Sequence, residues 1–157
     1  MTPHHTTVSE HAALNLLLVE DDEVDVMNIQ RAFRKCDMRP PLVAGDGAEA
    51  MAILKGQSDK QLPAGRRIVI LDLNLPKVTG LEFLRRLRAD TELCATPVII
   101  LTTSESDRDK VDAYSLNVAG YLLKPVTPDE LIEMVSDLAD YWHRNQFPSG
   151  GATAARG

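Results

Sequence analysis

The chain has 157 residues, of which 44% are hydrophobic and 25% charged, proportions of an ordinary globular domain with one core. A formal net charge of −6 and a pI near 5.2 disfavour a nucleic-acid-binding surface, because such surfaces present clustered basic side chains. No apolar run approaches the roughly 18 residues of a membrane span, and no secretory signal pattern opens the chain. We therefore expect a cytoplasmic protein that contacts neither nucleic acid nor membrane.

Both ends of the chain are polar in composition. We expect residues 1–12 to form a disordered leader and residues 147–157 a disordered tail, on either side of one domain at residues 13–146. His4, His5 and His11 leave a metal-binding cluster in the leader as the alternative. Cys36 and Cys94 match no metal-ligand or CxxC spacing, so we expect reduced thiols.

Between these ends, short apolar runs alternate with segments of helical spacing. The runs predict strands at residues 14–19, 42–44, 68–71, 98–101 and 120–123. Helices are predicted from residue 22 or 23 to about 36, over 48–55, around 81–87, over 107–117 and from about 128 to 145. Thr127 is the expected N-cap of the last helix, and the residues from 56 to 67 form a long polar loop. This alternation predicts an α/β fold with a parallel sheet covered by helices on both faces.

Four of the predicted strands end in polar residues of different chemistry. Glu20 and Asp21 follow the first strand, and Asp72 follows the third. Thr102 follows the fourth strand and Lys124 the fifth. The carboxyl ends of parallel strands meet at one ligand-binding edge, so we expect these side chains to converge.

Such a convergence of charges favours a cation. Carboxylates about 4 Å apart repel each other by on the order of 4 kcal/mol per pair at an effective dielectric near 20. A hard cation such as Mg²⁺, which prefers oxygen ligands, removes that repulsion. The residues therefore predict a site for a divalent cation and for a phosphoryl group carried on an aspartate.

The order and spacing of these residues resemble those of response-regulator receiver domains of bacterial two-component signalling, over about residues 14–145. Asp21 and Asp72 are 51 positions apart, Asp72 and Thr102 are 30 apart, and Thr102 and Lys124 are 22 apart. The resemblance implies a flavodoxin-like (βα)5 fold, a doubly wound sheet of five parallel strands in the order 2-1-3-4-5.

The resemblance also implies how the site works. Asp72 would accept a phosphoryl group from a partner histidine kinase, and Lys124 and Thr102 would contact that group. Four groups would bind Mg²⁺: the carboxylates of Asp21 and Asp72, the backbone carbonyl of Asn74, and Glu20 through water. The chain would not be an enzyme in the usual sense but a phosphoacceptor that assists its own phosphotransfer and dephosphorylation.

Two further features come from the same resemblance. Thr102 and Tyr121 would form a switch that moves the face of the fourth helix, fifth strand and last helix on phosphorylation. The Lys124–Pro125 peptide bond would be cis. Glu20 stands where the family more often has Asp. Thr103 replaces a smaller residue, so we expect it to restrict access to the phosphoryl group.

The residues after 145 are too few for an output domain, so we expect a stand-alone receiver. The long loop at residues 56–67, the segment at 73–77 and the extended last helix resemble those of small receivers that partner bacterial phytochrome kinases. Such receivers often dimerise through the switch face. The candidate residues for a homodimer or partner surface are Tyr114, Tyr121, Met134, Tyr141 and Trp142. Trp142 could instead pack within its own domain.

Three other functions use similar parts. A phosphatase of the haloacid-dehalogenase type needs an acid two residues after the nucleophile, where this chain has Asn74. A flavodoxin-like cofactor binder needs a phosphate loop after the first strand, which the sequence lacks. A pseudo-receiver that acts only as an interaction module stays as the alternative function.

Overall fold

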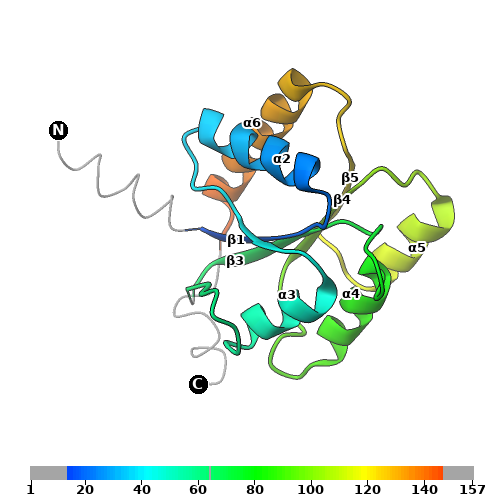
Figure 1. The fold of residues 1–157 in the computed structure, drawn as a ribbon. Coiled ribbons are helices and arrows are strands. Elements are labelled where there is room, and N and C mark those ends of the chain that lie inside the picture. The colour runs from blue at the N-terminus through cyan, green and yellow to red at the C-terminus, as the bar shows by residue number, and fades with distance from the viewer. Residues whose placement is uncertain (1–13, 64, 147–157) are drawn as a thin grey trace.

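The computed structural model describes residues 14–63 and 65–146 (Figure 1). The predicted leader at 1–12, with its three histidines, and the predicted tail at 147–157 lie outside the described residues. Within the described part, one sheet holds five parallel strands in the order β2-β1-β3-β4-β5, as predicted. Its strands are β1 (Asn15–Val19), β2 (Leu42–Ala44), β3 (Arg67–Leu71), β4 (Val98–Thr102) and β5 (Gly120–Leu123).

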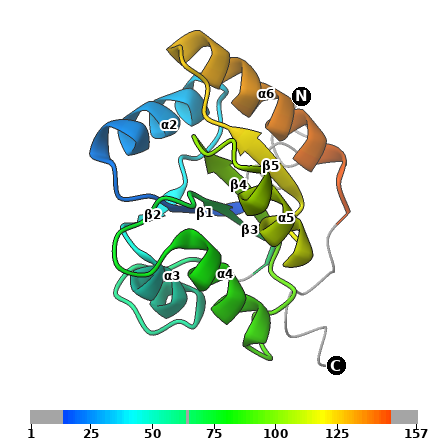
Figure 2. The ribbon, with the colours of Figure 1, turned by 90° about the vertical axis from the view of Figure 1, so that its right-hand side faces the viewer.

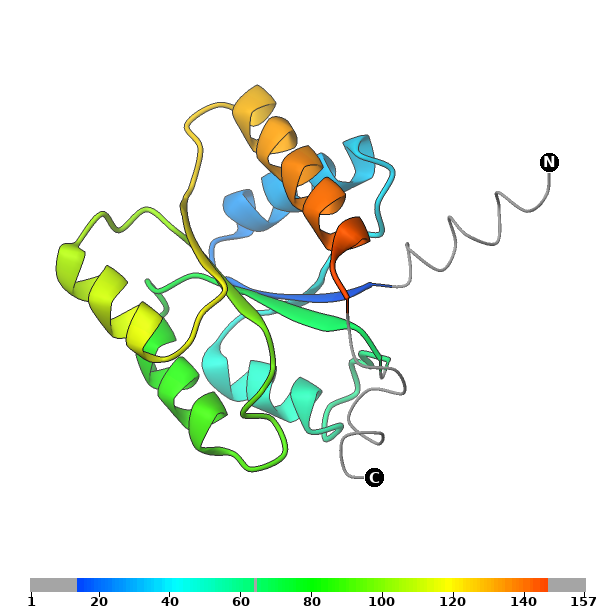
Figure 3. The ribbon, with the colours of Figure 1, turned by 180° about the vertical axis from the view of Figure 1, so that it is seen from behind.

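Helices cover both faces of this sheet. They are α2 (Glu23–Lys35), α3 (Gly47–Leu54), α4 (Gly80–Ala89), α5 (Asp107–Ser115) and α6 (Pro128–Arg144). Helices α2 and α6 lie side by side on one face, and α3, α4 and α5 lie on the other (Figures 2 and 3). None of the helices in the described residues is long and apolar enough to cross a membrane.

The strand side chains divide between two cores, which explains why the strands are apolar throughout. Alternate residues such as Leu17, Val69 and Ile100 pack against α3, α4 and α5, and their neighbours, such as Leu18 and Ile70, pack against α2 and α6. Truncation of one such leucine or isoleucine to alanine typically costs about 2–5 kcal/mol. The sheet is therefore a rigid base for the residues that follow its strands.

Side-chain caps fix where each helix begins. Asp22, Asp46, Thr79, Ser106 and Thr127 accept hydrogen bonds from backbone amides in the first turns of their helices. The Thr127 cap is confirmed, with a reciprocal bond from its amide to the Glu130 side chain and with Pro128 as the first helical residue. Helix α5 ends at Ser115, two residues before the predicted end, because Asn117 adopts a left-handed conformation with φ of 62°.

The long loop before β3 is attached to the domain at several points. The Arg67 guanidinium donates to the carbonyls of Leu54, Leu62 and Pro63. Lys60 Nζ donates to the carbonyl of Val43 on the edge strand β2, at 2.7 Å. Lys60 therefore occupies one backbone acceptor of this edge strand, where unpaired backbone groups are open to pairing with another chain.

Trp142 does not lie on the molecular surface. Its side chain is 2% exposed and packs in the core between the sheet and helices α2 and α6. The prediction that Trp142 contributes to a dimer face is therefore wrong, and the alternative of packing within its own domain is confirmed. The reason lies in helix α6, where Trp142 continues the buried stripe of Leu131, Val135 and Ala139.

Candidate functional site

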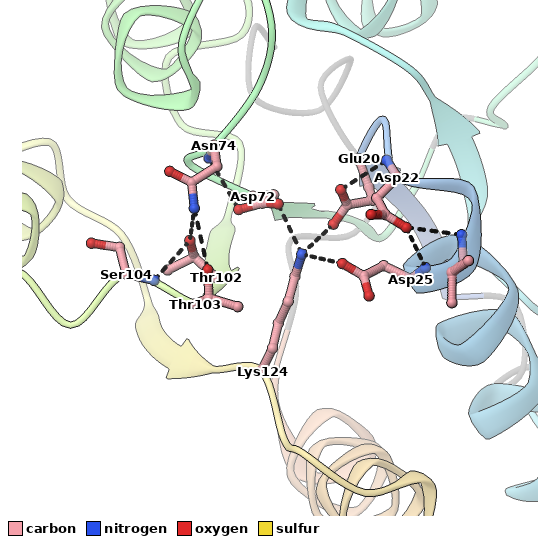
Figure 4. A network of polar contacts seen from close by, with 10 residues as sticks. Glu20, Asp22, Asp25, Asp72, Asn74, Thr102, Thr103, Ser104 and Lys124 are labelled. Carbon is pink, nitrogen blue, oxygen red and sulfur yellow. Dashed lines mark hydrogen bonds and ion pairs between the residues drawn. The ribbon is translucent and has the colours of Figure 1, made fainter.

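Three strand ends bring their polar residues together at the carboxyl edge of the sheet. In the parallel register Val19 is paired with Leu71, so Glu20 and Asp72 leave adjacent strands side by side. Lys124 follows β5, and its Nζ donates to Glu20 Oε1 at 2.6 Å and to Asp72 Oδ2 at 2.9 Å (Figure 4). The predicted convergence of these residues, up to 104 positions apart in the chain, is thus present.

A third carboxylate contacts the same ammonium and was missed by sequence reasoning. Asp25 Oδ2 lies 2.7 Å from Lys124 Nζ, in the first turn of α2 (Figure 4). Asp22, directly before this helix, has a different role, because it accepts bonds from the Val24 and Asp25 amides and caps the helix. The available signal was position: Asp25 lies one turn after Asp22, on a helix that starts beside the strand end.

Burial controls the charge of the Glu20 carboxyl. Glu20 is 2% exposed, and this burial raises its pKa to about 7. Hydrogen bonds from Lys124 and from the Asp22 amide oppose the shift, while the nearby Asp72 carboxylate adds to it. Glu20 is consequently the carboxyl group of this pocket whose protonation is sensitive near neutral pH.

Lys124 responds in the opposite way. Burial alone would lower its pKa, but hydrogen bonds to Asp25, Asp72 and Glu20 outweigh burial and raise its pKa above the ordinary lysine value. The ammonium therefore stays charged at physiological pH and balances part of the negative charge around it.

The donor set suits a hard divalent cation. Asp72 is 4% exposed, and Asp21, the residue after Glu20 in sequence, is exposed. In the part of the chain that the structure describes, no three His, Cys, Asp or Glu side chains already form a metal cage; the Lys124 ammonium lies among the carboxylates instead. Three carboxylates facing one ammonium leave unbalanced negative charge when all are ionised, and oxygen donors are the ligands that Mg²⁺ prefers.

Asn74 links the pocket to the loop after β4. Its backbone amide donates to Asp72 Oδ1 at 3.1 Å. Its side-chain amide donates to Thr102 Oγ1 at 3.5 Å and to Thr103 Oγ1 at 3.3 Å (Figure 4). Thr102 is fully buried, whereas Thr103 is exposed, so Thr103 and Asn74 form part of the pocket entrance on this side.

Tyr121 contacts the same loop from β5. Its hydroxyl donates to the Ser104 carbonyl at 2.9 Å, and the Ser104 hydroxyl donates to Asp109 Oδ2 on α5 at 2.6 Å. The ring is half-buried against the core on the α3, α4 and α5 side, and this burial raises the pKa of its phenol. Thr102 and Tyr121 therefore both bond to Ser104, since the Ser104 amide donates to Thr102 Oγ1 at 3.3 Å.

The Lys124–Pro125 bond is trans, as are the other peptide bonds of the described residues, so the predicted cis bond is wrong. Trans is the preferred isomer of an X–Pro bond by about 0.5–1 kcal/mol. The trans chain already satisfies Lys124, because its amide donates to the Thr102 carbonyl at 2.9 Å and its ammonium reaches the three carboxylates.

The remaining residues predicted for a dimer face have mixed exposure. Tyr114 on α5 is 54% exposed and Tyr141 on α6 is 58% exposed. Met134 is partly buried and packs against the core under α6. The two exposed tyrosines are therefore the residues of the predicted set that present most of their surface to another molecule.

Comparison with known proteins identifies the family. Residues 16–136 match the model of the response regulator receiver domain. The chain belongs to the response regulator receiver family. Receiver domains are signalling domains that bind a divalent metal and accept phosphoryl groups from histidine kinases.

Relatives of this receiver include both archaeal and cyanobacterial proteins. It is 39% identical over 130 residues to the probable methanogenesis regulatory protein FilR2 of Methanothrix harundinacea, covering 81% of this chain and 82% of FilR2. It is 34% identical over 128 residues to the response regulator Rcp1 of Synechocystis, covering 81% and 87%.

Solved structures of related regulators share the fold. The phosphorylated cyanobacterial phytochrome response regulator RcpA is similar with a TM-score of 0.73 and 31% identity, covering 87% of this chain and 99% of RcpA. The Mn²⁺-bound form of Rcp1 has a TM-score of 0.73 and 30% identity, with the same coverage.

Gly80 allows the loop that carries Asp72 to approach helix α4. Its amide donates to the Leu73 carbonyl at 3.1 Å. A Cβ at this position would overlap the backbone of Asp72 and Leu73, neither of which can move aside as a flexible side chain would.

We expect Gly80→Ala to destabilise the domain by about 1–3 kcal/mol, because the added methyl must displace that backbone. Urea unfolding followed by circular dichroism measures the change. Gly120→Ala is the matched control, because a Cβ there meets nothing within 4 Å. Equal stabilities for the two variants would contradict the close approach at Gly80.

Proposed function

We propose that this receiver accepts a phosphoryl group on Asp72 from the phosphohistidine of a partner kinase. The observation that carries the proposal is the environment of Asp72: one carboxylate oxygen contacts the Lys124 ammonium and the other the Asn74 amide. An Asp72 oxygen attacks phosphorus, the phosphorus–nitrogen bond breaks, and the electron pair returns to the imidazole. Asp72 is buried at the sheet edge, so its position is fixed before the donor arrives.

Magnesium fits the oxygen donors of this pocket. We assign its binding to the carboxylates of Asp21 and Asp72, the Asn74 backbone carbonyl, and Glu20 through water. When bound, the ion supplies positive charge that offsets the carboxylates and the transferring phosphoryl oxygens. The Mn²⁺-bound form of Rcp1 supports a divalent metal in this family.

The chain's own residues stabilise the transferred group. Lys124 supplies a point charge for the phosphoryl oxygens, and the Thr102 hydroxyl and the Asn74 amide supply hydrogen bonds. The same groups assist the later loss of phosphate to water. The receiver is thus a phosphoacceptor that takes part in its own chemistry, rather than an enzyme acting on a separate substrate.

Phosphorylation would be transmitted through Thr102 and Tyr121. The Thr102 hydroxyl oxygen accepts hydrogen bonds from the Asn74 side chain and the Ser104 amide, and its own hydrogen can be donated to a phosphoryl oxygen on Asp72. A shift of Thr102 moves the segment through Ser104, to which Tyr121 is bonded. Two arrangements of this segment would present two surfaces at α5, β5 and α6.

We propose that the partner is a histidine kinase of the bacterial phytochrome class, because RcpA, a cyanobacterial phytochrome response regulator, resembles this chain along most of its length. We further propose a cytoplasmic homodimer that uses the α5, β5 and α6 face, with Tyr114, Tyr121, Met134 and Tyr141 as its residues. The acidic net charge of −6 disfavours nucleic acid as a partner.

Acetyl phosphate with Mg²⁺ tests the phosphoacceptor. We expect intact-mass spectrometry to show one added phosphoryl group on the wild-type chain, none on Asp72→Asn, and none after the metal is chelated. Labelling of Asp72→Asn to the wild-type level would refute the assignment. A wild-type chain that never labels, even with a cognate kinase, would favour the pseudo-receiver.

Tyr121→Ala tests the switch. Removal of the ring and of its bond to Ser104 should leave phosphorylation of Asp72 within about threefold of wild type, because the hydroxyl of Tyr121 bonds to Ser104 and not to Asp72. The phosphorylation-dependent response, measured as a change in sedimentation or in kinase binding, should be lost. Tyr121→Phe is the matched variant, because it keeps the ring and loses only the hydroxyl bond to Ser104. A wild-type response from Tyr121→Ala would exclude the switch role.

Thr103→Ala tests the entrance formed with Asn74. Loss of this side chain removes one partner of the Asn74 amide and opens the pocket to water, so the phosphorylated form should decay faster, by about 2- to 10-fold. The decay rate is measured by quantitative phosphoprotein gels after donor removal. Thr103→Ser keeps the hydroxyl, so its phosphorylated form should decay at a rate nearer to that of wild type. Slower decay of Thr103→Ala would reverse the interpretation.

A further inference from the structure

Asp25 is a partner of Lys124 that belongs to a helix and not to a strand end. Its carboxylate lies 2.7 Å from Lys124 Nζ. Its backbone is held in the first turn of α2, because the Asp25 amide donates to the Asp22 side chain at 3.0 Å. The Asp25 side chain is 36% exposed, against 2% for Glu20 and 5% for Asp72. Asp25 therefore contacts the ammonium from the solvent-facing rim of the pocket.

Lys124 has as many carboxylate partners as it has donors. An ammonium carries three N–H groups, and Glu20, Asp25 and Asp72 each lie within 2.9 Å of Nζ. Two of these partners are buried residues to which we assigned magnesium binding. A cation held by Glu20 and Asp72 would draw their charge away from Lys124, whose side chain is 13% exposed and needs a counter-ion.

We propose, building on the function above, that Asp25 is a positioning residue for Lys124. Asp25 retains the ammonium on the α2 side of the pocket while Glu20 and Asp72 engage the divalent cation. Its charge also offsets the repulsion between that cation and the ammonium. Lys124 thereby stays paired and ready for a phosphoryl group in both the metal-free and the metal-loaded protein.

A second carboxylate, Asp22 at the start of α2, allows a test of whether the effect of Asp25 is specific or only a general effect of negative charge. Asp22 is exposed, precedes α2, and caps it through the Val24 and Asp25 amides, with no side-chain contact to Lys124 among the described bonds. Asn caps helices about as well as Asp. Asp22→Asn therefore removes one negative charge near the pocket and leaves both the helix cap and the Lys124 contacts in place.

Isothermal titration of the full chain with MgCl₂ tests the proposal. Asp25→Asn should raise the dissociation constant for Mg²⁺ about tenfold, the size of effect typical of groups that orient metal ligands. Asp22→Asn should stay within about twofold of wild type, because its charge is screened by solvent. Asp25→Glu should recover most of the affinity. Metal-free melting temperatures should show that every variant is folded, since Glu20 and Asp72 still pair with Lys124 in Asp25→Asn.

A second readout follows the ammonium itself. In ¹⁵N-labelled wild-type protein saturated with Mg²⁺, a slowly exchanging Lys124 ammonium signal should persist, and it should vanish in Asp25→Asn. If the wild type binds Mg²⁺ but Asp25→Asn and Asp22→Asn bind it with equal affinity, the role of Asp25 is overturned and the proposed function is not. A wild type that binds no Mg²⁺ would overturn the proposed function as well.

Discussion

The desolvation of Glu20, Asp72 and Lys124 at one end of the sheet is the constraint on which the site depends. Removing an ion from water costs several kcal/mol even after relaxation, so each of these groups is stable only while its partners stay in place. Glu20 and Asp72 lie close together because the parallel register aligns the ends of β1 and β3. Lys124 reaches both carboxylates from the end of β5. The sheet topology and the charge pairing thus support each other, and disruption of either weakens both.

A continuous series of contacts leads from this charged cluster to the surface at α5 and β5. Asp72 is joined to Asn74, Asn74 to the hydroxyls of Thr102 and Thr103, and the loop that follows them to Tyr121. The Ser104 hydroxyl extends the series to Asp109 on α5. The switch proposed above would act through these bonds, which are already formed in the structure.

Sequence reasoning identified what depends on strands. The apolar runs predict where the strands lie, and the carboxyl ends of parallel strands share one edge of the sheet. The proximity of Asp72 and Lys124 could therefore be predicted. Sequence reasoning failed where a side chain's position depends on the rotation of a helix or on tertiary context. Asp25 was missed because the phase of α2 relative to the sheet is not encoded in spacing alone. Trp142 was left open between the surface and the core, although its helical spacing matched the buried stripe. The isomer of the Lys124–Pro125 bond depends on contacts remote in sequence.

The saturated ammonium explains how an acidic pocket can persist before any ligand arrives. With its three donors bonded to Glu20, Asp25 and Asp72, Lys124 makes the pocket stable in the absence of metal, unlike small metal-dependent domains that unfold without their ion. A divalent cation bound as proposed would have to compete with Lys124 for Glu20 and Asp72, and this competition would limit its affinity. The metal would then exchange readily, and the lysine would stay beside the aspartate, where the proposed phosphoryl group requires a positive charge.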